Sequence, residues 1–226
     1  MAQAGMHGLV GMLPRKWTKG REWVLLGMLL GSFIPDMDNL GVAIATVAKL
    51  PTEGIHRTMT HSLFFAVAVT AVFFLVGQVR KDTRWNNLGF GLGLGILLHI
   101  LLDLVIWFNG VVILWPIPSW INFWGNTAPP EWFMKLMDPA EFLFFGLYLW
   151  ALGTWARKFN TDSNFLKTQR FWTLFEFVLF AIYTPLAYIM MSGFLTIFGG
   201  MYLFSLIVVF FLTIRMRDTV KAALSG

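Results

Sequence analysis

The sequence predicts an all-α, polytopic integral membrane protein: a helical bundle of about six to seven spans, including a short N-terminal helical hairpin. Hydrophobic residues make up 57% of the chain and charged residues only 13%, against roughly 25% charged residues in soluble domains. Several apolar runs approach the 20 or so helical residues that cross a bilayer. These runs are continuous rather than alternating, which argues against a membrane β-barrel.

The first half of the chain is expected to hold two short apolar helices and two full spans. The helices, at residues 7–17 and 22–34, form the hairpin, and local thinning of the bilayer would accommodate their short length. A partly polar interfacial segment is expected over residues 40–60. Residues 61–79 and 88–108 are the predicted spans, and the second of them organises the rest of the chain.

The second half is expected to begin with a non-helical connector over residues 109–139, rich in Pro and Trp. Trp at this density is typical of the interface between membrane and water. Three further spans are predicted at residues 140–156, 171–191 and 195–214. The whole chain, 1–226, is treated as a single membrane domain. Residues 1–118 would carry the functional site, and residues 119–226 would supply the connector and three membrane helices.

Basic residues indicate how the chain is oriented. The loops at 15–21, 80–84, 157–170 and 215–221 fall on one side if every span crosses once, and the positive-inside rule makes this side cytoplasmic. The C-terminus is then cytoplasmic. The net charge of +5 is explained by these loops, so the lipid bilayer is the expected partner and nucleic acid is not. Residues 1–13 lack the pattern of a cleavable signal peptide.

The span at 88–108 carries two ionisable residues, His99 and Asp103, at a spacing that places them on one helix face. Each costs several kcal/mol to insert into a membrane, roughly 2.5 to 3.5. The pair could bind a metal, form a structural hydrogen bond or relay protons. Gly91 and Gly95 continue this face and would let another helix approach closely. The glycine stripe could also support a homo- or hetero-oligomer.

Candidate ligands from four helix ends are expected at the non-cytoplasmic face. They are His7, Asp36, Asp38, His56, His61, His99 and Asp103. The chain has no cysteine, so nitrogen and oxygen atoms would hold any metal. Imidazole and carboxylate together suit Zn, Mn or Fe. We expect one or two divalent ions, with Zn as the first choice.

The segment before the span at 61–79 holds further polar residues with expected roles. His56 is expected to support the metal ligands rather than join them. Thr60 is predicted to be the N-cap of a helix that begins at His61, and Ser62 would lie beside the site. Arg57 is either an interfacial anchor or a clamp for a phosphate group. Asp36 could instead be a turn residue at a helix end.

Three short blocks in this order resemble a known family. They are Pro35-Asp36-x-Asp38, His56-Arg57-x-x-Thr60-His61-Ser62 and Gly95-x-x-x-His99-x-x-x-Asp103, followed by Leu114-Trp115-Pro116. Over residues 5–118 the chain resembles the YdjM-like family of bacterial, LexA-regulated inner-membrane proteins described as metal-dependent hydrolases. The resemblance implies a metal site on His7, Asp36, Asp38, His61, His99 and Asp103. The family usually opens with a Thr-His pair, whereas Met6 precedes His7 here.

The expected function is a membrane hydrolase that uses metal-activated water to cleave an ester or phosphoester of a lipid-like, membrane-soluble substrate. Asp38 and Arg57 are the expected catalytic residues, with Arg57 neutralising the developing anion. A non-catalytic structural or assembly subunit of a larger membrane complex is the alternative. A transporter is a third reading, but it would require paired discontinuous helices, and no matching pair occurs in the second half.

Overall fold

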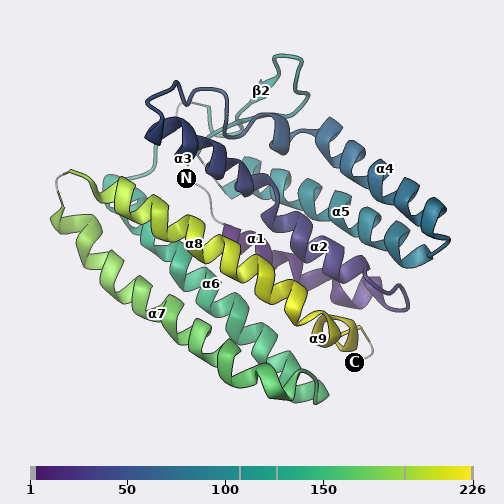
Figure 1. Ribbon diagram of the computed structural model, residues 1–226. Helices are drawn as coiled ribbons and strands as arrows, with labels where there is room; N and C mark the ends of the chain where they lie inside the picture. Colours follow the sequence, from purple (N-terminus) through teal and green to yellow (C-terminus); the bar gives the residue numbers. More distant parts are fainter. Residues whose placement is uncertain (1–3, 107, 126, 191, 225–226) are drawn as a thin grey trace. The chain divides into compact units, whose positions relative to one another are not determined.

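The computed structural model describes residues 4–106, 108–125, 127–190 and 192–224, and this part of the chain is helical with a small β-hairpin (Figure 1). The helices are α1 (Ala4–Gly11), η1 (Leu13–Thr18), α2 (Val24–Phe33), η2 (Pro35–Asp38), α3 (Asn39–Val47), η3 (Met59–His61), α4 (Leu63–Arg80), α5 (Thr83–Ile106), α6 (Glu131–Phe159), η4 (Ser163–Phe165), α7 (Leu166–Ile189), α8 (Phe194–Arg215) and α9 (Arg217–Ala222). The strands β1 (Val111–Val112) and β2 (Trp120–Ile121) pair antiparallel.

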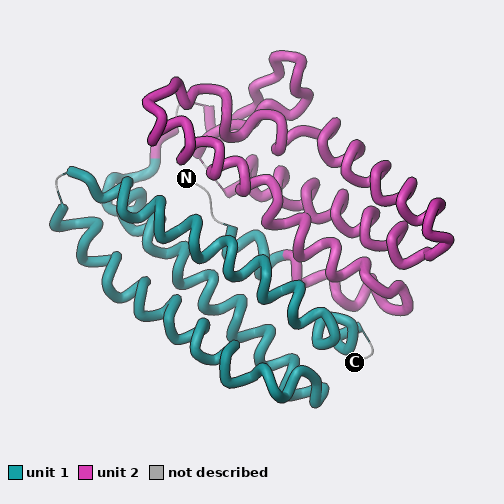
Figure 2. Tube along the Cα trace, viewed as in Figure 1, with its two compact units in different colours: residues 1–10, 129–226 teal, residues 11–128 magenta. Residues whose placement is uncertain are grey.

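The chain divides into two compact units, which Figure 2 colours separately. Unit 1 comprises Met1–Val10 and Pro129–Gly226, and unit 2 comprises Gly11–Ala128. Helix α1 therefore belongs with α6 to α9, whereas α2 to α5 and the β-hairpin form unit 2. Whether both units make up one membrane domain, as the sequence predicts, stays a prediction.

Four helices among the described residues are long and apolar enough to cross a membrane. They are Leu63–Arg80, Thr83–Ile106, Ser163–Ile189 and Phe194–Arg215. These correspond to four predicted spans, although α5 begins five residues before its predicted start, and Trp107, near its predicted end, lies outside the described residues. The six to seven predicted spans are not shown. Helices α1 and α2, of 8 and 10 residues, extend only about 12 and 15 Å, against roughly 30 Å of hydrocarbon.

The connector differs from its prediction. Residues 109–139 were expected to be non-helical, but a β-hairpin forms within them and α6 begins at Glu131. Pro139 lies inside α6, although a proline normally interrupts a helix. Phe142 and Phe145 follow it with no exposed surface, so the packing of this helix outweighs the local penalty of the proline.

Helix α5 is the centre of unit 2 and presents a glycine face to each neighbour. A Cβ atom at Gly91 or Gly95 would collide with backbone carbonyl oxygens of α2, and one at Gly89 or Gly93 would collide with Phe73 or Thr70 of α4. The predicted close approach of a helix along Gly91 and Gly95 is confirmed. This face packs against α2 of the same chain, and an oligomer through the glycine-striped helix stays a prediction.

Unit 1 is built around α6, and its buried aromatic residues pack along this helix. Phe142 lies 5.0 Å from Tyr183 of α7 between ring centroids, and Phe145 lies 6.2 Å from Tyr202 of α8. Glu141, also fully buried, accepts a hydrogen bond of 2.9 Å from the backbone N–H of Gly5. This carboxyl therefore holds the first turn of α1 against α6.

Candidate metal centre

The polar residues of unit 2 converge at one end of its helices. Helix α2 runs parallel to α5 and α4 runs antiparallel to it, as the glycine contacts show. The C-terminal ends of α2 and α5 therefore meet the N-terminal end of α4 (Figure 1). The short turns η2 and η3 lie at this end, and with the last turns of α5 they supply the candidate ligands.

Proline shapes the first of these turns. The N–H of Ile34 donates to the carbonyl of Leu30 and closes α2. Pro35 has no N–H to continue that pattern, and the chain tightens into the 3-10 turn η2. Asp36 and Asp38 are two residues apart in this turn and point to different partners. Asp36 lies near the Nε2 atoms of His61 and His99, whereas Asp38 lies near the Nδ1 atoms of His56 and His61.

Four donor atoms form a compact set: Asp36 Oδ1, His61 Nε2, His99 Nε2 and Asp103 Oδ2. The two nitrogen atoms are 3.2 Å apart. Asp36 Oδ1 lies 3.8 and 3.7 Å from the nitrogens of His61 and His99, and Asp103 Oδ2 lies 3.5 and 3.8 Å from them. Ligands of a tetrahedral zinc ion are separated by roughly 3.3 to 3.6 Å, and Asp36, His61 and His99 are close enough together to hold one ion.

The hydrogen bonds of the two rings fix where their lone pairs point. Nδ1 of His99 lies 2.8 Å from the carbonyl oxygen of Ser32, which can only accept, so Nδ1 carries the proton. Nδ1 of His61 lies 3.1 Å from the hydroxyl of Thr60. This hydroxyl donates its own proton to Asp38 over 2.7 Å, and so it accepts from His61. When the rings are neutral, Nε2 of each therefore carries a lone pair directed into the cluster.

Asp38 supports the back of this cluster. Its carboxylate accepts hydrogen bonds from Nδ1 of His56 at 2.7 Å and from the backbone N–H of Arg57 at 3.3 Å, besides the one from Thr60. It also lies 3.3 Å from Nδ1 of His61. A carboxylate behind a ligating histidine is the usual device that fixes the tautomer and orientation of the ring.

The same contacts shift the pKa values of this pair. Burial raises the pKa of Asp38, but its hydrogen bonds and electrostatic interactions with His56 and His61 lower this pKa by a larger amount, so the net pKa lies well below that of an ordinary carboxyl. Burial lowers the pKa of His56, and its hydrogen bond with Asp38 offsets only part of that shift. Asp38 is therefore ionised at neutral pH.

The charges of the cluster favour a divalent cation. With Asp36, Asp38 and Asp103 ionised, the cluster would hold three negative charges, and the Arg57 guanidinium would add one positive charge. Arg57 is 3% exposed, and its Nη2 lies 3.8 Å from Asp103 Oδ2. With neutral imidazoles these groups sum to a charge of −2. Buried charge is costly unless it is paired or bound to metal, so a divalent ion would balance the site.

The loop before α4 differs from its prediction in one respect. Helix α4 begins at Leu63, and Ser62 is its N-cap, since the Ser62 hydroxyl accepts from the N–H of Phe65 at 3.1 Å. The prediction that Thr60 is the N-cap was wrong. Residues Met59–His61 form the 3-10 turn η3, and this turn directs the Thr60 hydroxyl to Asp38 instead.

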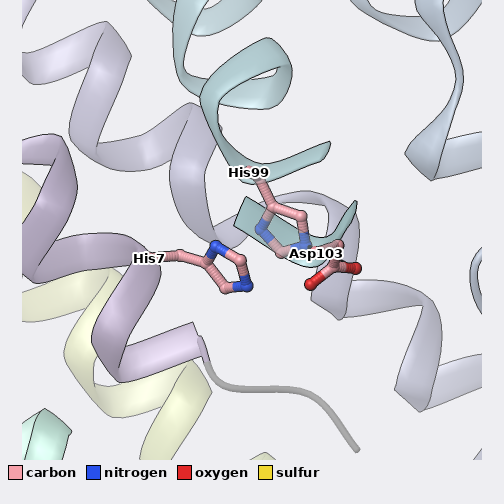
Figure 3. Close-up of side chains that lie close together, drawn as sticks. All are labelled: His7, His99 and Asp103. Atoms are coloured by element: carbon pink, nitrogen blue, oxygen red, sulfur yellow. Dashed lines mark ion pairs between the residues drawn. The ribbon is translucent and has the colours of Figure 1, made fainter. Parts of the chain in front are cut away.

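Helix α5 supplies two of the donors. Figure 3 shows His99 and Asp103 one turn apart on α5, with the ring and the carboxylate on the same side of the helix. The figure also draws His7, which belongs to α1 and hence to unit 1. The four donor atoms of Asp36, His61, His99 and Asp103 all belong to unit 2. The role of His7 as a ligand stays a prediction.

Two contributions to the site were missed by sequence reasoning, and both come from the backbone. The Ser32 carbonyl orients the ring of His99. Strand β1 holds the metal-site loop, the segment from Arg57 to Leu63 that contains His61, because the N–H of Val112 donates to the Arg57 carbonyl at 2.9 Å. Arg57 has a left-handed conformation with φ of 62°. Of these two contributions, only the first could have been predicted, from the position of Ser32 four residues before Asp36 at the end of an apolar run.

Fold and site together define a helical membrane protein with buried His/Asp clusters that could hold metal ions. The chain matches the model of the YdjM inner membrane protein family over residues 3–214. It belongs to this family and is an inner membrane protein. The match extends well past residue 118, where the resemblance seen in the sequence ended. No curated protein and no solved structure matched the chain.

Proposed function

We propose that this protein is a membrane-embedded, metal-dependent hydrolase that cleaves an ester or phosphoester of a lipid-like substrate with activated water. The proposal rests on one observation above all. The Nε2 lone pairs of His61 and His99 converge at 3.2 Å, together with carboxylate oxygens of Asp36 and Asp103. Two nitrogen lone pairs this close repel one another unless a metal cation or a proton lies between them.

Asp36, His61, His99 and Asp103 would hold the metal, with Zn as the first choice and Mn or Fe as alternatives. Such an ion lowers the pKa of water and neutralises a developing anion. One ion suits the four donors. The oxygens of Asp38, the carboxylate needed for a second ion, already accept several hydrogen bonds. His7 would be a further ligand, as the sequence predicts.

The chain's own groups have distinct tasks in this scheme. Asp38 is a positioning residue that keeps the proton of His61 on Nδ1, instead of the catalytic or ligand role that the sequence suggested. The Arg57 guanidinium, buried beside Asp103, would bind the anionic oxygen of a phosphoester or of a developing tetrahedral centre. His56 and Thr60 hold Asp38 in place, and Ser62 fixes the start of α4.

The position of the site at the end of α4 and α5 supports a substrate that partitions into the bilayer. The basic residues of the 80–84 loop lie at the opposite end of both helices. By the positive-inside rule, we place the site at the non-cytoplasmic face and the C-terminus in the cytoplasm. A substrate ester near the headgroups would be at the same depth as the site.

The alternative function is a structural or assembly subunit that keeps its metal for stability. The burial of the ligands favours it, because Asp36, His61, His99 and Asp103 are at most 1% exposed. A catalytic ion must offer a position to water and substrate. The two functions therefore share the metal and differ in whether this ion exchanges a ligand with solvent.

Elemental analysis of the detergent-purified protein tests the metal. We expect about one equivalent of a transition metal in the wild type and none in His99→Ala. Ile100→Ala is the matched control, since Ile100 is the next residue of α5 and is 3% exposed, so the variant loses buried volume without losing a donor. Its metal should be retained. A wild type without metal, even after reconstitution, would reduce His99 and Asp103 to an interhelical contact.

Activity is then tested on lipid esters and phosphoesters with the metal-loaded protein. Hydrolysis in the wild type and its loss in Arg57→Gln, with metal content unchanged, would support the proposed role of the guanidinium. Metal-loaded protein that cleaves none of these substrates would favour the structural subunit instead.

A further inference from the structure

The loop that follows α5 is strongly apolar yet exposed. No charged residue occurs between Asp103 and Glu131. Residues 108–125, called the aromatic loop below, contain the β1–β2 hairpin and a cluster of large exposed side chains: Trp115, Ile117, Trp120, Phe123 and Trp124 are exposed by 39%, 55%, 55%, 65% and 36%. Large apolar side chains exposed at this density within one loop are typical of a binding surface or a membrane contact.

The aromatic loop begins beside the end of a predicted membrane span. Its Trp124 donates from Nε1 to the carbonyl of Val105 at 3.1 Å and packs on Phe108 with 4.4 Å between ring centroids. Helix α5, with 24 residues, is about 36 Å long and so spans the roughly 30 Å of hydrocarbon. A helix that spans the hydrocarbon ends near the headgroups, and Trp favours this region of a bilayer.

The same loop is bonded directly to the metal-site segment. The N–H of Val112 donates to the Arg57 carbonyl at 2.9 Å, and the N–H of Leu63 donates to the Ile113 carbonyl at 2.9 Å. These two bonds bracket Arg57 to Leu63, the stretch that contains His61. Whatever fixes the depth of the aromatic loop therefore fixes the depth of the candidate metal centre.

We infer that the aromatic loop is a membrane-contact surface that lies among the phospholipid headgroups and holds the metal centre at that depth. Its occupant is the bilayer itself. Together with the proposed function, on which this step rests, this depth implies that the ester bond of the substrate lies at the boundary between headgroup and acyl chain. A soluble ester would not reach it at the same rate.

A neighbouring segment of unit 2 has the opposite character. Residues 48–54 form the first part of the connection between α3 and η3 and include Lys49, Pro51 and Glu53, all exposed. This segment leads into the same metal-site loop but carries charge, and it should therefore face water. The two segments provide a matched pair of positions for measuring depth.

The test measures the depth of single spin labels in phosphatidylethanolamine and phosphatidylglycerol vesicles. The chain has no cysteine, so Ile117→Cys, Glu53→Cys and Val72→Cys can each be labelled without background. Val72, near the middle of α4 and 55% exposed, is the deep reference. The readout is the ratio of collision rates with oxygen, which enters the bilayer, and with a water-soluble nickel chelate.

We expect the ratio at position 117 to lie well above that at position 53 and below that at position 72. A ratio equal to that at position 53 would place the loop in water and overturn the inference. Low collision rates with both reagents would show that another protein surface covers the loop, which also overturns it. Depth is measured without reference to metal or activity, so this result is independent of whether the hydrolase proposal stands.

Discussion

His61 and His99 face each other through their Nε2 atoms at 3.2 Å, while each ring is held from behind at Nδ1 by an acceptor. Two neutral imidazoles in this arrangement cannot hydrogen-bond to each other, since both would present lone pairs. The contact is stable only with a cation between the rings or after protonation of one ring. The proposed function corresponds to the first arrangement, with a metal cation between the two rings.

Removal of the metal should destabilise the fold. A ligand that binds only the folded state contributes about 2.7 kcal/mol when its free concentration is 100 times its dissociation constant. EDTA should therefore lower the thermal unfolding temperature of the detergent-solubilised wild type, and excess Zn²⁺ should restore it. Differential scanning fluorimetry measures both. In His99→Ala, EDTA should have no effect, and an equal shift in wild type and variant would assign the stabilisation to another site.

Substitution of Asp38 should weaken metal binding without abolishing it. Asp38 contacts His61 through Nδ1, away from the four donors, and loss of such a partner typically costs roughly 10- to 100-fold in metal affinity. Competition with a fluorescent zinc chelator measures the dissociation constant for Asp38→Ala. Complete loss of metal in this variant would instead make Asp38 a direct ligand, as the sequence first suggested.

Substitutions of Thr60 and Thr58 provide a matched test of how Asp38 and its hydrogen-bond partners hold the ring of His61. The Thr60 hydroxyl bonds to Asp38 and His61, whereas the Thr58 hydroxyl bonds to the Gly54 carbonyl at 2.8 Å. Thr60→Val should raise the dissociation constant for zinc, and Thr58→Val should leave it unchanged. Equal effects would indicate that the loop as a whole, rather than the tautomer of His61, controls affinity.

The sequence predicted the members of the cluster better than their roles. The four-residue spacing of His99 and Asp103, and the glycine stripe on the same face, follow from helix periodicity, which local sequence determines. Asp36 and Asp38 could not be told apart, because their separate directions depend on the 3-10 turn after Pro35. Thr60 and Ser62 are both good caps, and only the start of α4 at Leu63 decides between them.

Tertiary contacts account for the other differences between prediction and structure. Nothing in the composition of the Trp-rich connector indicates that β1 pairs with β2 or that the N–H of Val112 bonds to Arg57. The second glycine face, Gly89 and Gly93, packs against α4 and was not predicted, because it lies away from the face that His99 and Asp103 define. The segment up to Pro139 was expected to be non-helical, but packing around Phe142 and Phe145 keeps α6 helical through this proline.

Glu141 is expected to anchor α1 in unit 1. Its carboxyl accepts from the Gly5 N–H at 2.9 Å, in the manner of a helix cap, and removal of such a group costs about 1 kcal/mol. Glu141→Ala should raise the hydrogen-exchange rate of the first turn of α1 about fivefold, which corresponds to this free energy. Glu131→Ala is the control on the same helix. That side chain is 82% exposed, and protection of α1 should be unaffected.

Gly95→Ala should destabilise the packing of α2 against α5. A methyl group there would collide with the carbonyl oxygen of Met28, and overpacking of this kind costs typically about 1 to 3 kcal/mol. Gly199→Ala is the matched control, because the added Cβ at that position of α8 meets nothing within 4 Å. Alanine is the better helix former by up to about 1 kcal/mol, so this control should be neutral or slightly stabilised. Unfolding titrations in mixed micelles give both free energies. Since Gly95 lies one turn before His99, Gly95→Ala should also lower the affinity for zinc, whereas two variants of equal stability and affinity would show that α2 does not set the position of the ligands.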